Sequence, residues 1–230
     1  MIPYKTVRIG GQGEIEEKKS RFIASVQPVS TEAEALDFLA AMRKKYWDAR
    51  HNCYAYTIGS RFELQRCSDD GEPGGTAGRP ILGVLLNEEI HNCIVVVTRY
   101  FGGTLLGTGG LVRAYQAAAQ AGLAASTIIV RRLGRKLTIY TDYNSIGRLQ
   151  FLTAKEHIPV LDNRYTDTVE MDVIAPEDCI QSFPDQVTEA TGGTAKIQAG
   201  DWTEYAEADG EVLVFGSIEI NDTVGNGSVV

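Results

Sequence analysis

Two α+β domains are predicted by this sequence, from the room for two cores and from the order of the elements. A chain of 230 residues with 43% hydrophobic residues can bury two modest cores, since domains usually span about 100–150 residues. Strand-like and helix-like segments follow one another in the second half in the order β-α-β-β-α-β, which is typical of a ferredoxin-like unit. We therefore expect domains at 1–134 and 135–200, and an acidic tail at 201–230 in which 211–220 has the pattern of an extra strand.

The first half contains segments with clear strand or helix patterns before its central region. Ser30 and Thr31, followed by Glu32 and Glu34, are typical of a helix N-cap with acids in the first turn. Pro80 suits the first turn of a second helix. The predicted elements are a strand at 20–29, a helix from 32 to about 45, short strands at 52–58 and 62–66, and a helix from 79 to about 90.

The central region, 94–115, combines a strand, a glycine-rich loop and a helix. The β-branched run at 94–98 predicts a buried strand, and apolar residues recur at three- and four-residue spacing from Thr108 onward. Free N–H groups and the positive end of a helix dipole then meet at the loop, where they favour an anion such as phosphate. The loop residues proposed to contact it are Gly102, Gly103, Gly107, Thr108, Gly109 and Gly110.

This loop does not match the phosphate motifs of known mechanics. Gly102 and Gly107 have the spacing of a Walker A loop, but Thr108 stands where that loop has its lysine. Gly107 and Gly109 begin like a dinucleotide fingerprint, whereas Val112 replaces its last glycine. The alternative is that the glycines only allow a tight turn between strand and helix.

Side chains next to the loop extend the candidate site. Arg99 can hold phosphate with two hydrogen bonds, and Tyr100 and Phe101 can stack on bases, while Arg79 and Arg113 flank the same surface. In the alternative, Tyr100 and Phe101 are core residues and the arginines neutralise nearby acids. Both interpretations stay open at this point.

An acidic loop, formed by Asp69, Asp70, Gly71 and Glu72, is expected to border the same cleft. Paired carboxylates serve acid–base chemistry or Mg²⁺, although this composition is also ordinary turn chemistry. His51 with Cys53 has a nucleophile alternative, but the sequence identifies no third, orienting group for it.

Two His-x-Cys pairs, at 51–53 and 91–93, raise a zinc alternative. Their spacing is unusual for zinc, because structural sites place ligands two to four residues apart on a knuckle. We predict no metal site and no cofactor.

The second half begins at a basic step, 131–136, which we take as the domain boundary. A strand at 127–130 leads into it. The ferredoxin-like elements predicted beyond it are a strand at 137–143, a helix at 145–156, strands at 158–165 and 168–174, a helix at 176–190 and a strand at 194–198; residues 221–230 are expected to be loose.

Charge and cysteine usage limit the partners and the compartment. The net charge is −8, but residues 201–230 hold seven acids and no Lys or Arg, so the remainder is nearly neutral and leaves room for a local basic patch. Four scattered cysteines, no export signal and no apolar run long enough for a bilayer predict a cytoplasmic protein without a membrane role.

Three segments resemble the signature of the IMPACT family: DARHNCYAY at 48–56, SDDGEPGGTAGRPIL at 68–82 and RYFGGTLLGTGGLVRAY at 99–115. The resemblance covers roughly residues 20–130, and the segment after Lys136 is similar to the small domain that bacterial members add. It implies an amino-terminal α/β sandwich like the second domain of a small-subunit ribosomal protein and domain four of elongation factor G. It also implies a ferredoxin-like second domain similar to the last domain of that factor. Eukaryotic relatives regulate translation initiation, but carry an RWD domain that this sequence does not show.

Three functions follow from these observations. The leading hypothesis is a noncatalytic nucleic-acid- or ribosome-associated protein with a translation-regulatory role, whose partner is RNA, the ribosome or a protein of translation control. The first alternative is an enzyme acting on a small phosphorylated or nucleotide substrate, with Asp69 or Asp70 as base or metal contact. The second alternative is a protein-interaction module, which needs neither loop.

Overall fold

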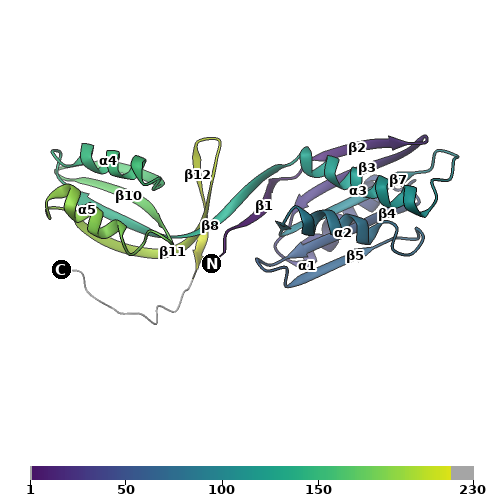
Figure 1. The fold of residues 1–230 in the computed structure, drawn as a ribbon, viewed down its shortest axis with the longest axis horizontal. Helices are drawn as coiled ribbons and strands as arrows, with labels where there is room; N and C mark the ends of the chain where they lie inside the picture. The colour runs from purple at the N-terminus through teal and green to yellow at the C-terminus, as the bar shows by residue number, and fades with distance from the viewer. Residues whose placement is uncertain (1, 219–230) are drawn as a thin grey trace. The chain divides into compact units, whose positions relative to one another are not determined.

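The computed structural model describes residues 2–218, and the chain divides into two compact units (Figure 1). The N-terminal unit is Tyr4–Val130, and the C-terminal unit begins at Arg131. Strand β8, Thr127–Thr141, runs continuously from one unit into the other. The basic step at 131–136 is therefore part of a strand, and the division falls four residues before the boundary placed at 134/135.

An antiparallel five-stranded sheet forms the centre of the N-terminal unit, in the order β2-β3-β7-β4-β5. Its middle strand, β7, is buried along both faces, as expected for the apolar run at 94–98. The strands are β2 (Gln12–Glu17), β3 (Ser20–Pro28), β4 (His51–Ile58), β5 (Leu64–Ser68) and β7 (Cys93–Tyr100). Outside this sheet, β1 (Tyr4–Ile9) pairs in parallel with β6 (Ile90–His91).

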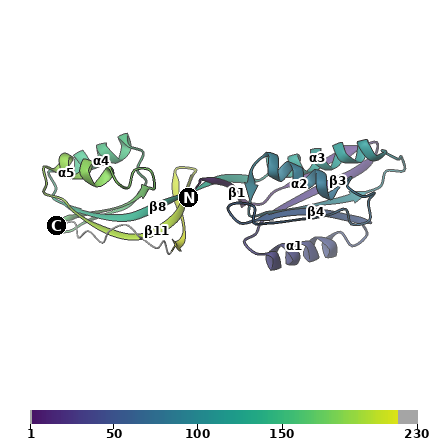
Figure 2. The ribbon, with the colours of Figure 1, turned by 60° about the horizontal axis from the view of Figure 1, so that its bottom comes forward.

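Helices cover both faces of this sheet, α2 (Gly78–Asn87) and α3 (Thr108–Ala124) on one face and α1 (Glu32–Lys45) on the other (Figure 2). The alternation of β7 assigns its side chains to the two layers. Cys93, Val95 and Val97 pack in the core with α2 and α3, whereas Ile94 and Val96 pack with α1.

The local signals in the first half are confirmed with small shifts. Thr31 caps α1, since its hydroxyl accepts a hydrogen bond from the Glu34 N–H at 3.2 Å. The strand expected at 62–66 is shifted by two residues. Phe62 has a positive φ of 56° and stacks on His91 with ring centroids 3.7 Å apart, so it belongs to the turn before β5.

The C-terminal unit has the ferredoxin-like order, and the predicted α+β fold class is confirmed. Its sheet runs β9-β10-β8-β11-β12, and α4 and α5 pack on a core that contains Ile139, Met171 and Phe183. The elements after β8 are α4 (Ile146–Lys155), β9 (Val160–Tyr165), β10 (Val169–Pro176), α5 (Phe183–Thr191), β11 (Lys196–Ala208) and β12 (Glu211–Ile218).

Two elements of this unit differ from the prediction. Helix α5 begins at Phe183, because Pro176 is still paired with Gly134 as the last residue of β10. Strand β11 continues to Ala208 and forms a hairpin with β12, so residues 201–208 are not part of a tail. The segment expected to be loose, 221–230, lies outside the described residues. Within residues 2–218, no helix has the length and hydropathy needed to cross a membrane.

Candidate nucleic-acid interface

The candidate residues gather at one end of the N-terminal sheet, where β7 ends. Antiparallel register sets His51 at the start of β4 opposite Arg99, and Arg21 near the start of β3 opposite Tyr100. The acidic loop follows β5 at this end, and the glycine loop leads from β7 into α3. We call this region the β7 end.

Arg99 lies in a buried cluster rather than at the surface. Its side chain is only 8% exposed, and Nη1 lies 2.6 Å from Oε1 of Glu72, whose side chain is 4% exposed. The Tyr115 hydroxyl donates to the same Glu72 oxygen at 2.8 Å. Arg99 shares the strand face of Val95 and Val97, so it points into the core under α2 and α3. The expectation that Arg99 grips phosphate is therefore wrong, and the neutralising interpretation holds for it.

Cys53 extends this cluster, and its thiol is held within the fold. Its thiol donates to the Asp69 carbonyl at 2.9 Å and lies 3.3 Å from the Tyr115 hydroxyl oxygen. Burial raises the pKa of Cys53 to about 12, so the thiolate is not populated at neutral pH. Burial likewise raises the pKa of Tyr115, which keeps its hydroxyl protonated as the donor to Glu72.

Asp69 holds the beginning of α2. One carboxylate oxygen accepts the N–H of Gly75 at 2.8 Å, and the other accepts those of Ala77 and Gly78 at 2.9 and 2.8 Å. Burial by itself raises the pKa of Asp69, but the N–H donors of Gly75, Ala77 and Gly78 outweigh it and the pKa is lowered. Asp69 therefore acts as a structural cap.

Asp70 is also engaged within the fold. Its carboxylate accepts the Asn52 N–H and the Arg43 guanidinium, both at 2.7 Å. Both carboxylates that the enzyme alternative names as base or metal contact therefore have hydrogen-bond partners within the fold. In residues 2–218, no three His, Cys, Asp or Glu side chains come together as a metal-sized group.

The backbone geometry explains why the first three candidate positions of the glycine loop are glycine. Gly102 donates its N–H to Ser20 Oγ at 3.1 Å, and a Cβ there would lie 2.0 Å from the carbonyl carbon of Lys19. Gly103 and Gly107 have positive φ of 84° and 73°, and Gly107 is the N-cap of α3. For these three residues the tight-turn interpretation accounts for glycine.

The first turn of α3 differs, because it is open. Thr108 and Gly109 are exposed, and a Cβ added at Gly109 would meet a single neighbour, Nη1 of Arg113 at 3.8 Å. The exposed Arg113 side chain thus folds back toward the helix start, the direction that long helical side chains favour. Gly110 is closely packed, since its Cβ would lie 2.9 Å from that of Leu106.

The aromatic candidates divide between the two interpretations. Tyr100 is partly buried, and its hydroxyl donates to Asp48 at 2.7 Å. Phe101 is 55% exposed, with its ring centroid 5.6 Å from the Arg99 guanidinium carbon.

The two remaining candidates lie at the surface. Arg79 is exposed on the first turn of α2, and Gly71 is an exposed turn residue with a φ of 87°.

Two features of the β7 end were not predicted from the sequence: a pair of exposed apolar side chains and the hydrogen bond between Tyr115 and Glu72. Trp47 and Leu105 are each 83% exposed, one just after α1 and the other inside the glycine loop. An apolar residue within a glycine-rich loop was a usable signal for Leu105. The Tyr115 link to Glu72 gave no comparable signal, because Tyr115 fits the apolar stripe of α3.

Two family models match the chain, the Impact N-terminal domain at residues 18–123 and Domain of unknown function (DUF1949) at 139–194. The IMPACT family member YvyE of Bacillus subtilis is 38% identical over 205 residues, covering 89% of this chain and 94% of its own. YigZ of Escherichia coli is 32% identical over 186 residues, covering 80% and 91%. A crystal structure of a hypothetical protein is similar with a TM-score of 0.56 and 29% identity, covering 87% of this chain and 98% of that one.

Proposed function

The chain belongs to the IMPACT family, and we propose that it binds RNA through the first turn of α3, in a translation-related role. The observation that carries the proposal is the meeting of exposed helix-start amides with the Arg113 guanidinium, 3.8 Å from the Cβ position of Gly109. The N–H groups of a first helical turn have no intrahelical acceptor. Together they offer a phosphate several donors and a positive charge.

The exposed aromatic ring of Phe101 supports RNA over a free phosphate. It leads the glycine loop, and base stacking on such rings is sequence-tolerant. Arg79 adds a second exposed cation on the same face of the sheet, at the start of α2. A phosphate-binding helix start with a neighbouring ring suits a nucleic-acid strand.

The translation-related part of the proposal rests on the family. Relatives named Protein IMPACT in Mus musculus and Homo sapiens are 39% and 37% identical over 98 residues, which cover 30% of each of those proteins. The family resemblance implies a role in translation initiation for the eukaryotic members. The match to the Impact N-terminal domain, residues 18–123, includes the β7 end, and this supports placing an RNA-contacting role there.

The enzyme alternative has less support at this site. Its base or metal contact was Asp69 or Asp70, and hydrogen bonds occupy both carboxylates. The protein-interaction alternative keeps one specific observation, the exposed apolar residues Trp47 and Leu105 at the same end. An RNA titration at several salt concentrations separates the two, because phosphate contacts give a steep salt dependence, whereas burial of apolar side chains such as Trp47 and Leu105 does not.

Arg113→Gln tests the proposal in the full chain. We expect weaker binding of a short unstructured oligouridine, measured by fluorescence anisotropy, and a slope of log affinity against log salt reduced by about 0.7–1, as for one lost phosphate contact. The matched control is Lys5→Gln, which removes one exposed charge next to Ile90, just before β7 begins. Equal binding by Arg113→Gln, Lys5→Gln and the wild-type protein would overturn the proposal and favour the protein-interaction alternative.

A further inference from the structure

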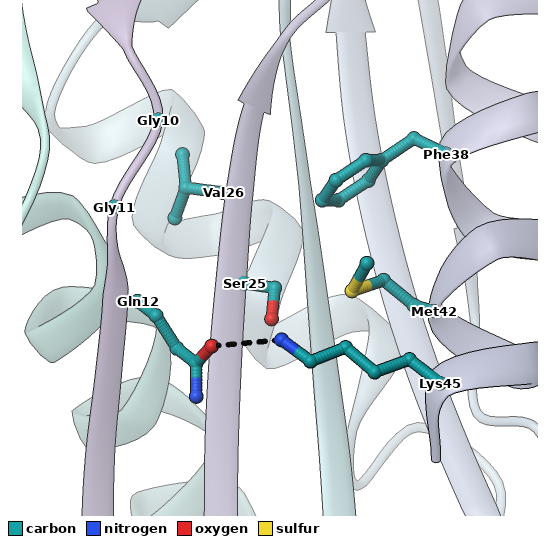
Figure 3. A pocket seen from close by; sticks show the side chains of 8 residues that line it. All are labelled: Gly10, Gly11, Gln12, Ser25, Val26, Phe38, Met42 and Lys45. Carbon is teal, nitrogen blue, oxygen red and sulfur yellow. Dashed lines mark hydrogen bonds between the residues drawn. The ribbon is translucent and has the colours of Figure 1, made fainter. Parts of the chain in front are cut away.

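A hollow lies on the opposite face of the N-terminal sheet, between the sheet and α1 (Figure 3). Its volume is about 230 Å³. The residues that line it are Gly10, Gly11, Gln12, Ser25, Val26, Phe38, Met42 and Lys45. No residue of the β7 end contributes to it, so the hollow is independent of the proposed RNA site.

Strand register and helix periodicity explain why these side chains converge. Gln12 on β2 pairs directly with Ser25 on β3, and paired residues of antiparallel strands share a face. Phe38, Met42 and Lys45 are spaced by four and three residues, so they form one stripe of α1 that faces this part of the sheet.

Two glycines close the rim of the hollow. The Gly11 carbonyl accepts the Val26 N–H at 3.0 Å, and a Cβ on Gly10 would lie 2.0 Å from the Val26 carbonyl oxygen. The connection between β1 and β2 can therefore approach β3 this closely only with glycine at position 10. The rim is thus part of the backbone.

The polar groups in the hollow are mainly donors. Ser25 is 6% exposed, and its hydroxyl has no hydrogen-bond partner among the described residues. Lys45 Nζ contacts the neutral Gln12 Oε1 at 3.3 Å and lies 5.0 Å from the Tyr46 ring centroid. Ser25 and Lys45 both line the hollow (Figure 3), and no acid lines it.

We propose that this hollow binds a small monocarboxylate with an apolar body. The carboxylate would accept from the Ser25 hydroxyl and the Lys45 ammonium, which leaves a buried hydroxyl satisfied and a cation paired. The apolar body would lie against Phe38 and Met42. The volume of about 230 Å³ is below the roughly 300–1,000 Å³ of drug-sized sites and suits a ligand of a few carbons.

A single charge on the ligand is favoured over a phosphate monoester. Lys45 is the one cation that lines the hollow in the described chain, whereas a phosphate monoester carries about −1.5 to −2 charges at neutral pH. Phe38 and Met42 form the apolar part of the wall and suit a hydrocarbon chain better than a hydrated sugar. Isovalerate is therefore a suitable probe.

The test uses methyl NMR of the full chain titrated with isovalerate. Met42 lines the hollow, and Met171, in the core of the C-terminal unit, is an internal control. We expect a saturable shift of the Met42 methyl signal and none at Met171. Acetate, which lacks the apolar body, and isovaleramide, which lacks the charge, should bind at least about tenfold more weakly.

Substitutions then locate the binding. Lys45→Met, which removes the charge, should weaken isovalerate about tenfold, and Ser25→Ala should weaken it severalfold. Lys44→Met, at the neighbouring exposed position of α1, should leave affinity unchanged. Equal affinity of Lys45→Met and Lys44→Met, equal binding of amide and acid, or no saturable Met42 shift would overturn the proposal. Each of these results leaves the oligouridine experiment unaffected.

Discussion

The two loops at the β7 end differ in where their polar groups are directed: those of the acidic loop bond within the chain, and those of the glycine loop are exposed. In the acidic loop, Asp69, Asp70 and Glu72 each accept hydrogen bonds within the chain, from backbone N–H groups, an arginine or a tyrosine. In the glycine loop and the first turn of α3, Thr108, Gly109 and Arg113 are exposed. The acidic loop thus supports the fold, and the glycine loop presents a surface.

Loops rich in charged residues and glycines can thus have either of two roles, stabilising the fold or binding a ligand. Carboxylates in a turn are strong hydrogen-bond acceptors, so a fold can use them as caps and ion-pair partners. A helix start without a side-chain cap keeps its donors available, and Gly107, the N-cap of α3, supplies no such acceptor. Stability effects should therefore concentrate in the acidic loop and binding effects in the glycine loop.

Glu72→Ala should have the largest effect on stability. It leaves Arg99, 8% exposed, as an uncompensated buried charge and also removes the acceptor of the Tyr115 hydroxyl. Breaking a buried pair in this way costs roughly 3–5 kcal/mol. Urea unfolding followed through the amide signals of β7 measures it.

The matched control for this variant is the double substitution Glu72→Leu with Arg99→Met. It removes both charges, so it should be much less destabilising than Glu72→Ala alone. A cost below about 1 kcal/mol for Glu72→Ala would contradict a structural role for the ion pair.

Asp69→Asn should destabilise the N-terminal unit by an amount that depends on pH. The pKa of Asp69 in the folded protein is below its ordinary value of 3.8, so ionised Asp69 stabilises the fold above that pH and loses this contribution as the pH falls through the folded pKa. At neutral pH we expect a cost of about 1–2 kcal/mol, typical of a lost helix cap. Urea unfolding at decreasing pH should show the gap between wild type and variant closing, and a constant gap contradicts this assignment.

Much of the fold was predictable because its signals are local. The Thr31 cap, the start of α3 at Thr108 and the ferredoxin-like order depend on residues close in sequence. The hairpin of β11 and β12 also has a local signal in the sequence. Asp209 and Gly210 both have positive φ, 55° and 79°, and Asp-Gly is typical of a two-residue hairpin turn.

The interior of the candidate site was less predictable, because its contacts join distant residues. A strand buried on both faces has no polar and apolar alternation, so the sequence of β7 does not show that Arg99 points toward α2 and α3. Glu72 meets Tyr115 across 43 residues, and this contact needs the packing of α3 on the sheet. The exposure of Arg113, by contrast, follows from the helix periodicity, because Arg113 lies off the apolar face of α3.

Phe101→Ala should weaken RNA binding without a stability cost. Its ring is 55% exposed, and stacking on one base contributes roughly 1–3 kcal/mol. Fluorescence anisotropy with oligouridine should show the loss. Tyr100→Phe is the control, because it removes only the hydroxyl that donates to Asp48 and keeps the ring. A larger loss of affinity for Tyr100→Phe than for Phe101→Ala would contradict the prediction, because it would show that the RNA contact depends on the Tyr100 hydroxyl and not on the Phe101 ring.

The smallest expected effects come from two adjacent glycines, which give the sharpest comparison. Gly109→Ala places a methyl group in the open first turn of α3, where Arg113 Nη1 at 3.8 Å is its one neighbour, so the fold accepts it and the approach to the amides narrows. Gly110→Ala brings a Cβ within 2.9 Å of the Leu106 Cβ, so that side chain must move. We expect Gly109→Ala to bind oligouridine a few-fold more weakly at an unchanged or slightly higher melting temperature, since alanine favours a helix over glycine. Gly110→Ala should instead lower the melting temperature. If Gly109→Ala binds as tightly as wild type at low salt, the α3 amides do not contact phosphate, and the proposed RNA site is wrong.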